Sequence, residues 1–443
     1  MFGLKGESYM PEIYILVILL GVLVAFIYLL CQDVLNPALI FAIVFFLAAA
    51  NLATNINSVG VTLHIDTVIY ILVGVLAFFI GSIVVSKTTF RISSNGYFRF
   101  KYFSGRHVHL PKKKMLIILV FNMVGCAYIM YDVYSLVKNY VGYIGNILGA
   151  AGTFATYSKY GDMGLQISGI SNILVCVLET ESYVIGYIIA TNLAKKRKTD
   201  LITILCFVTS FISTFCMGSR GGVLIIISIA FMFIMQYRLI RSVKHISMKL
   251  VRRMIMVVIF AIIVFQISGT LAQKNWDVPF YEYLSVYVGF PIYNFDVAFN
   301  NGIVHTDIFG AASFGGLYKN FLSDFETYTN FRTFLHLNGH NMGNVYTIFA
   351  TLTADFGNYG SMIALFVIGF LMQVLYNSAK KDKEELSVKK IVCAFFLVCT
   401  AFSFFSNKIC EAIIVWRFYW LVFLYIWKIV LTSKKGEHNN IDI

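Results

Sequence analysis

The stretch from Ile13 to Leu30 reads IYILVILLGVLVAFIYLL and contains no charged residue. An α-helix needs about 20 mainly apolar residues to cross the hydrocarbon core of a bilayer. A membrane-spanning strand would instead alternate apolar and polar side chains over a segment of about ten residues. The stretch therefore predicts a membrane-spanning helix, and it argues against a β-barrel.

Ten further apolar runs follow along the 443-residue chain, which is 59% hydrophobic and only 13% charged, with a mean hydropathy of +0.77. This composition excludes a water-soluble globular protein. We therefore predict an all-α polytopic membrane bundle, formed as a single integral membrane domain over residues 1–443. The eleven predicted spans cover about 13–31, 36–54, 67–85, 115–137, 169–192, 200–217, 223–237, 254–272, 345–377, 391–410 and 412–431.

Basic residues are distributed unevenly among the connections. The segments 87–114, 195–198, 238–253 and 380–390 and the C-terminal tail hold eight, four, six, five and two of them, 25 of the 35 in the chain. With eleven spans these segments all lie on one side, which the positive-inside rule assigns to the cytoplasm. The N-terminus is then outside and the C-terminus inside. We interpret the basic runs, including the cytoplasmic loop 87–114, as topology signals and lipid-headgroup contacts, and not as a nucleic-acid surface.

The cysteines give no sign of a disulfide framework or a metal site. All eight fall inside the predicted spans or at their ends, and no two form a C-x-x-C pair. We interpret them as small apolar residues of the bundle.

Two predicted external segments are long, namely 138–168 and 273–344. Because the cytoplasmic connections are short and basic, we expect binding or chemistry at the outer face. The tyrosines of the larger loop suit either an aromatic belt at the membrane interface or stacking on sugar rings, and the belt is the preferred interpretation.

The first motif is C-M-G-S-R-G-G at 216–222, between two predicted spans. Its glycines permit a tight turn and a close backbone approach. The guanidinium of Arg220 suits a phosphate or pyrophosphate group, because its planar fork donates two parallel hydrogen bonds. The alternative is that Arg220 is an anchor that holds a helix end at the interface.

The second motif runs from the large loop into the interrupted helix 345–377. It contains His340 and Asn341, then N-V-Y-T at 344–347, then D-F-G-N-Y-G at 355–360. Glycine and aspartate inside an apolar stretch predict a broken or re-entrant helix, which is tolerated only where the freed backbone faces protein or water.

These motifs resemble the oligosaccharide repeat-unit polymerases (Wzy) of bacterial O-antigen and capsule synthesis. The resemblance rests on G-S-R-G at an outer hairpin, a long external loop, and N-V-Y-T followed by D-F-G-x-x-G. The His340-Asn341 pair is also similar to the related O-antigen ligases (WaaL). At the level of motifs the likeness covers only about 216–222 and 340–377.

The resemblance implies a GT-C-like glycosyltransferase of the bacterial cytoplasmic (inner) membrane that uses undecaprenyl-pyrophosphate-linked oligosaccharides and needs no metal or other cofactor. Its other expected partners are membrane lipids, a chain-length regulator and a flippase. Arg220 would bind the pyrophosphate, and Arg332 is a second choice on position alone. His340 would act as general base or orient the donor phosphate, whereas His336 is better interpreted as an ordinary loop histidine. Supporting candidates are Ser219, Asn341, Asp355, Glu181 and Arg417.

Charged side chains inside the predicted spans must face the bundle interior or a cavity. Either Glu179 or Glu181 is expected to pair with a basic residue such as Arg417, and this is the preferred interpretation. A proton relay through these glutamates would instead indicate a transporter, such as a lipid-linked oligosaccharide flippase. An O-antigen ligase is a third possibility that differs from the polymerase only in its acceptor.

Overall fold

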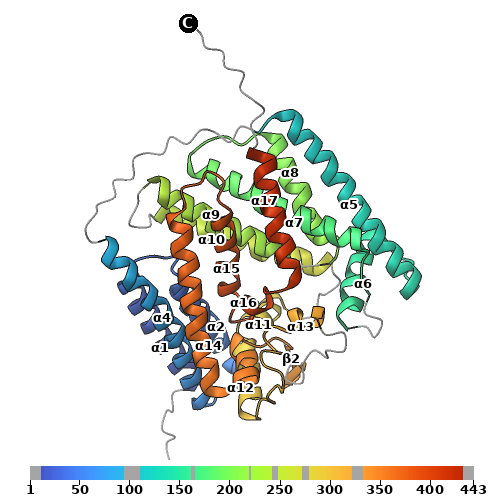
Figure 1. The fold of residues 1–443 in the computed structure, drawn as a ribbon. Coiled ribbons are helices and arrows are strands. Elements are labelled where there is room, and N and C mark those ends of the chain that lie inside the picture. The colour runs from blue at the N-terminus through green and yellow to red at the C-terminus, as the bar shows by residue number, and fades with distance from the viewer. Residues whose placement is uncertain are drawn as a thin grey trace, which may run out of the picture. The chain divides into compact units, whose positions relative to one another are not determined.

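The computed structural model describes residues 11–93, 110–160, 165–218, 221–241, 248–271, 279–321 and 333–432, and this part of the chain is predominantly helical (Figure 1). It separates into two compact units. Unit 1 consists of residues 1–98, 276–378 and 396–415, and unit 2 of residues 99–275, 379–395 and 416–443.

Unit 1 begins with four helices, α1 (Glu12–Cys31), α2 (Pro37–Ala53), α3 (Ile56–Val59) and α4 (Ile65–Ser93). Helices α1, α2 and α4 pack against one another. The side chain of Asn36 begins α2 by accepting hydrogen bonds from the backbone N–H groups of Ala38 (3.0 Å) and Leu39 (3.3 Å), and the following proline suits the first helical position.

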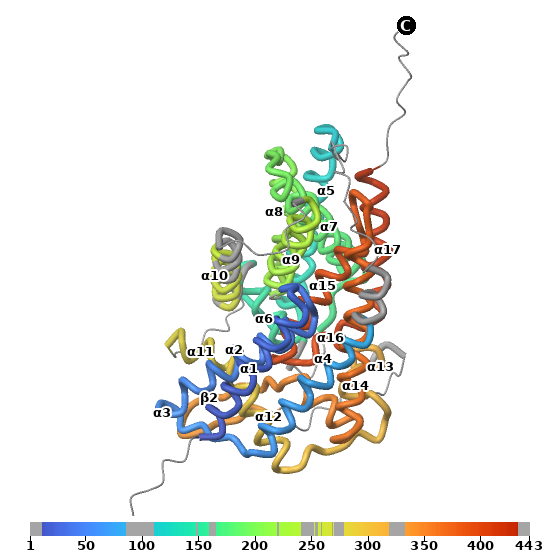
Figure 2. Tube along the Cα trace, turned by 90° about the vertical axis from the view of Figure 1, so that its left-hand side faces the viewer, coloured from blue at the N-terminus to red at the C-terminus, as the bar shows by residue number. Residues whose placement is uncertain are grey.

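The segment predicted as an external loop, 273–344, has regular structure of its own. It contains α11 (Phe280–Val288), α12 (Phe290–Asn300), α13 (Gly315–Phe321) and an antiparallel hairpin of β1 (Leu335–Leu337) and β2 (His340–Gly343). Asn338 and Gly339 form the turn, both with positive φ, as in the two-residue turns that match the twist of a hairpin. Helices α11 and α12 contact both α2 and β2, so that α3, α12 and the hairpin gather at one end of unit 1 (Figure 2).

Helix α14 (Ile348–Lys381) is interrupted at Gly357, where φ is 66° and ψ is −175°. The interruption lies in the D-F-G segment, where the sequence predicts a break. Gly369 of α14 packs so closely on α4 that a Cβ at this position would overlap the Phe78 carbonyl oxygen. Gly81 of α4 approaches the Phe366 carbonyl oxygen of α14 in the same way. Such small residues let membrane helices pack backbone to backbone. The α16 helix (Lys408–Glu411) completes unit 1.

Unit 2 is built around α7 (Gly169–Ala194), which packs against α5 (Lys112–Val141), α8 (Leu201–Ile212) and α9 (Gly221–Arg241). Around this group lie α6 (Ile147–Tyr160), the short 3-10 helix η1 (Ser213–Phe215), α10 (Met248–Leu271) and α17 (Val415–Thr432). Helix α15 (Val388–Ala401) contributes its first part, up to Phe395, to this unit.

Among the described residues, seven helices are long and apolar enough to cross a membrane, namely α1, α4, α5, α7, α9, α14 and α17. The protein is an all-α polytopic membrane protein. Helices also lie at the other predicted spans, but α2, α8 and α15 are shorter. Two predicted connections differ from the structure: α4 extends to Ser93, inside the predicted loop 87–114, and α6 lies inside the predicted loop 138–168.

Candidate functional site

His340 lies on β2 directly after the hairpin turn, and its Nδ1 is 2.7 Å from Oε1 of Glu282 on α11. Both side chains are partly accessible, with 32% of the His340 side chain and 20% of the Glu282 side chain exposed. An ionised carboxylate only accepts hydrogen bonds, so Nδ1 carries the proton in this pair. The Nε2 atom of a neutral ring is therefore left with a lone pair that can take a proton.

Both elements that carry this pair are held in place by polar contacts within unit 1. Helix α11 is tied to the end of α2, where Asn55 Nδ2 donates to Ser285 Oγ at 3.3 Å and Thr54 contacts the Tyr281 hydroxyl. The hairpin is fixed by Asn294, whose Nδ2 donates to the carbonyls of Met342 and Val345 at 3.0 and 2.9 Å. A histidine and a carboxylate presented by such fixed elements are preorganised for chemistry.

Asn341, the neighbour of His340, has a local structural role. Its Oδ1 accepts a hydrogen bond from the backbone N–H of Gly343 at 2.8 Å, which shapes the end of β2. His336 lies opposite Asn341 on β1 and is exposed, and its side chain has no hydrogen-bond partner among the described residues.

Asp355 of the D-F-G segment anchors a loop. Its Oδ1 accepts from the Thr306 hydroxyl (2.9 Å) and the Ala312 N–H (2.8 Å), and its Oδ2 accepts from the Ser313 N–H (2.7 Å). This geometry assigns Asp355 to positioning the segment 306–313 beside the interruption in α14.

Unit 2 holds the other two described candidates. Arg417 pairs with Glu179 (Nη1 to Oε1, 3.4 Å), and its guanidinium lies over the rings of Phe395 and Trp420 at 4.4 and 5.2 Å from their centroids. The expectation that one of the two α7 glutamates pairs with Arg417 is therefore confirmed, and Glu179 is that residue.

Glu181 is fully buried in α7 and makes a different contact. Its Oε1 accepts from Asn122 Nδ2 of α5 at 2.7 Å, whereas its Oε2 and the Asn122 Oδ1 have no partner in the described part of the chain. Burying a carboxyl oxygen without a hydrogen-bond partner inside a helical bundle costs free energy. In membrane proteins, buried ionisable side chains of this kind mark functional positions.

Arg220, Ser219 and Arg332 lie outside the described residues. The residue that precedes Ser219 is described: Gly218 has a φ of 60°, and a Cβ at this position would overlap the Ala151 carbonyl oxygen of α6. The G-S-R-G motif thus begins with a glycine that needs both a left-handed backbone and a close approach to another helix.

Gly218→Ala is expected to lower the free energy of unfolding by about 2 to 4 kcal/mol, because the backbone strain and the overlap with Ala151 add together. Gly142→Ala is a matched control, since Gly142 also has a positive φ of 68° but has open space where a Cβ would lie. It should cost only about 1 to 2 kcal/mol. Equal losses in denaturant unfolding of the purified variants would show that the approach to α6 contributes nothing.

Two carboxylate partners of histidines were not predicted from the sequence. Glu282 is one of several acidic residues of the large loop, and nothing in the sequence links it to a histidine 58 positions away. The other is Asp296, which is almost fully buried and lies 2.9 Å from Nδ1 of the exposed His64. The sequence does contain a signal for the hairpin that positions His340, because an Asn-Gly pair such as Asn338-Gly339 is typical of a two-residue hairpin turn.

Within the described ranges, no group of three or more histidine, cysteine or acidic side chains could hold a metal ion. Comparison with family models, with curated proteins and with solved structures gives no match.

Proposed function

We propose that this protein polymerises undecaprenyl-pyrophosphate-linked oligosaccharide repeat units at the outer face of the bacterial cytoplasmic membrane. The observation that carries the proposal is the pair formed by His340 and Glu282, a partly exposed imidazole oriented by a carboxylate. It lies in the segment that the positive-inside rule assigns to the outside. Imidazole in this arrangement is suited to taking a proton from a sugar hydroxyl.

In the proposed reaction, an acceptor hydroxyl loses its proton to Nε2 of His340 as its oxygen bonds to the anomeric carbon of the donor. The bond from that carbon to the pyrophosphate oxygen breaks, undecaprenyl pyrophosphate leaves with the electron pair, and the configuration inverts. Glu282 stabilises the imidazolium that results. Arg220 and Arg332 stabilise the negative charge that grows on pyrophosphate.

The proposal includes a membrane arrangement. Eleven spans in a GT-C-like architecture place the N-terminus outside and the C-terminus in the cytoplasm, with both His340 and Arg220 at the outer face. The substrate is a lipid whose pyrophosphate lies at headgroup depth. A flippase would deliver it, and a chain-length regulator would set the number of repeats.

A transporter of lipid-linked oligosaccharides is the second candidate function, and Glu181 is the observation in its favour. A proton-coupled carrier would need a buried carboxyl group such as this one, whose Oε2 has no partner in the described part of the chain. Purified protein in vesicles with a lipid-linked repeat unit distinguishes the candidates. A polymerase makes a ladder of longer glycans, a ligase makes none without its own acceptor, and a flippase only moves the unit across the membrane.

The arrangement of spans predicts the accessibility of single cysteines to an impermeant thiol reagent in intact cells. Cysteines introduced at Arg106, Lys196 and Lys244 should resist labelling, whereas those at Lys159 and Asn301 should react. The native cysteines give a small background, since six are buried and two half-buried. Labelling of the first group would invert or break the eleven-span arrangement.

A further inference from the structure

The basic run Lys195–Lys198 directly follows the end of α7, and the turn at this point directs its side chains to two different sides. Lys196 has a φ of 57°, the Lys196 N–H donates to the Leu193 carbonyl at 3.1 Å, and the Arg197 N–H donates to the Asn192 carbonyl at 2.8 Å. This pattern of hydrogen bonds around a left-handed residue reverses the chain at a helix end. Lys195 and Arg197 consequently line one pocket, whereas Lys196 and Lys198 are exposed and do not line it.

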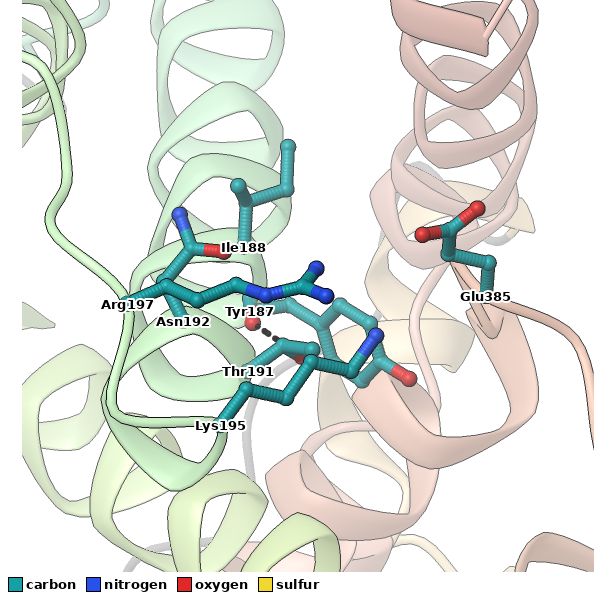
Figure 3. A pocket seen from close by; sticks show the side chains of 7 residues that line it. All are labelled: Tyr187, Ile188, Thr191, Asn192, Lys195, Arg197 and Glu385. Atoms are coloured by element: carbon teal, nitrogen blue, oxygen red, sulfur yellow. Dashed lines mark hydrogen bonds between the residues drawn. The ribbon is translucent and has the colours of Figure 1, made fainter. Parts of the chain in front are cut away.

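The pocket combines two basic residues, one acidic residue, Glu385, and polar and apolar residues of α7, all from unit 2. Figure 3 shows the Lys195 ammonium and the Arg197 guanidinium extending from the end of α7 toward the segment that carries Glu385. The remaining lining comes from the last turns of α7, namely Tyr187, Ile188, Thr191 and Asn192. It thus presents two cations and one carboxylate, beside the buried side chains of Tyr187 and Ile188.

The two cations of this pocket lack an ion-pair partner among the described residues. Glu384, which is close in sequence, is paired with Lys428 at 2.6 Å. Burial, the nearby charge of Arg197 and only partial compensation by Glu385 hold the pKa of Lys195 below its usual value. Two adjacent, partly desolvated cations favour the binding of an anion.

We propose that this pocket binds the phosphodiester group of an anionic membrane phospholipid, a role independent of the glycan chemistry proposed above. The Arg197 fork would hold two phosphate oxygens, and Lys195 would supply a point charge. The position favours a lipid over free phosphate, because α7 is a membrane-spanning candidate that ends at Ala194, and a membrane crossed by α7 would place the pocket at headgroup depth. The side chains of Tyr187 and Ile188 are buried and belong to the protein wall of the pocket, so the proposed contact is with the phosphate group.

The test is a titration of the purified full-length protein in neutral detergent with phosphatidylglycerol, with phosphatidylcholine and with inorganic phosphate. The measured quantity is the increase in unfolding temperature that each ligand causes. Lys195→Gln with Arg197→Gln removes the two cations of the pocket, and Lys196→Gln with Lys198→Gln removes the same charge from the exposed positions. We expect the affinity for phosphatidylglycerol to fall about tenfold or more in the pocket variant and less than about threefold in the exposed variant. Phosphatidylcholine and inorganic phosphate should give little stabilisation.

Three outcomes overturn the proposal. Equal losses of phosphatidylglycerol affinity in the two double variants would indicate diffuse attraction, and equal stabilisation by inorganic phosphate would indicate a free anion as ligand. The third is that phosphatidylglycerol does not stabilise the wild-type protein. If the pocket variant unfolds before lipid is added, Arg197→Lys replaces it. That variant keeps the charge and loses the fork, so weaker binding supports the site and unchanged binding contradicts it.

Discussion

His340→Ala is expected to lower the rate of repeat-unit polymerisation by about 100- to 10,000-fold, the usual contribution of a positioned general base. The loss should fall on turnover more than on donor binding, because the ring acts on the proton of the acceptor hydroxyl. The fold should survive, since His340 is partly exposed and, among the described residues, its side chain hydrogen-bonds only to Glu282. The measurement is the rate of glycan extension by purified protein with a lipid-linked repeat unit.

The pH dependence of that rate separates the two roles considered for His340. A general base works only as the neutral ring, so activity should be lost as pH falls. An imidazolium that orients phosphate would reverse the sign, with activity lost as pH rises. Glu282→Gln removes the carboxylate that stabilises the imidazolium formed in the proposed step, so a base at His340 should lose turnover in that variant.

The hairpin supplies its own control for this prediction. His336→Ala changes an exposed histidine on the neighbouring strand whose side chain has no hydrogen-bond partner in the described part of the chain, and it should change neither rate nor pH profile. If His340→Ala keeps wild-type turnover and an unaltered profile, His340 does not belong to the site. The base would then have to be sought elsewhere in the large loop, where Asp324 and Glu326 are the nearest acidic residues in sequence.

Much of the membrane architecture is predictable because the bilayer imposes a local rule. A span must be apolar at nearly every position, so a run such as 13–30 identifies α1 without reference to the rest of the chain. The same rule makes a glycine-containing polar break conspicuous, and the interruption of α14 indeed lies at Gly357. Both features depend on residues that are adjacent in sequence.

The structure of the segment 273–344 is less predictable because its contacts are distant in sequence. Glu282 reaches His340 only because α11 and the hairpin both pack in unit 1. Asp355 is a candidate for the site because of its motif, and its hydrogen-bond partners were equally invisible in the sequence. Its oxygens are already used by Thr306, Ala312 and Ser313, donors that lie more than forty positions earlier.

Arg220→Lys should lose most of the polymerising activity, by about 100- to 1000-fold, although the positive charge is kept. Removal of one oriented charge-stabilising donor costs about 3 to 4 kcal/mol in the transition state. The ammonium group of lysine is a point charge that cannot reproduce the two parallel hydrogen bonds of a guanidinium on pyrophosphate. The measurement is the same extension rate, with the amount of folded protein in the membrane determined alongside.

Arg220→Ala distinguishes this clamp from the alternative of a helix anchor. An anchor needs only a long side chain with a charged end, so lysine should preserve both activity and protein level, and alanine should reduce the protein level first. A clamp needs the fork, so lysine and alanine should both abolish extension while folded protein remains. Normal extension by the lysine variant at an unchanged protein level would contradict the clamp and leave Arg220 as an interfacial anchor. The charge on the leaving pyrophosphate would then have to be stabilised by another donor, and Arg332, the only arginine of the large loop, is the next residue to replace.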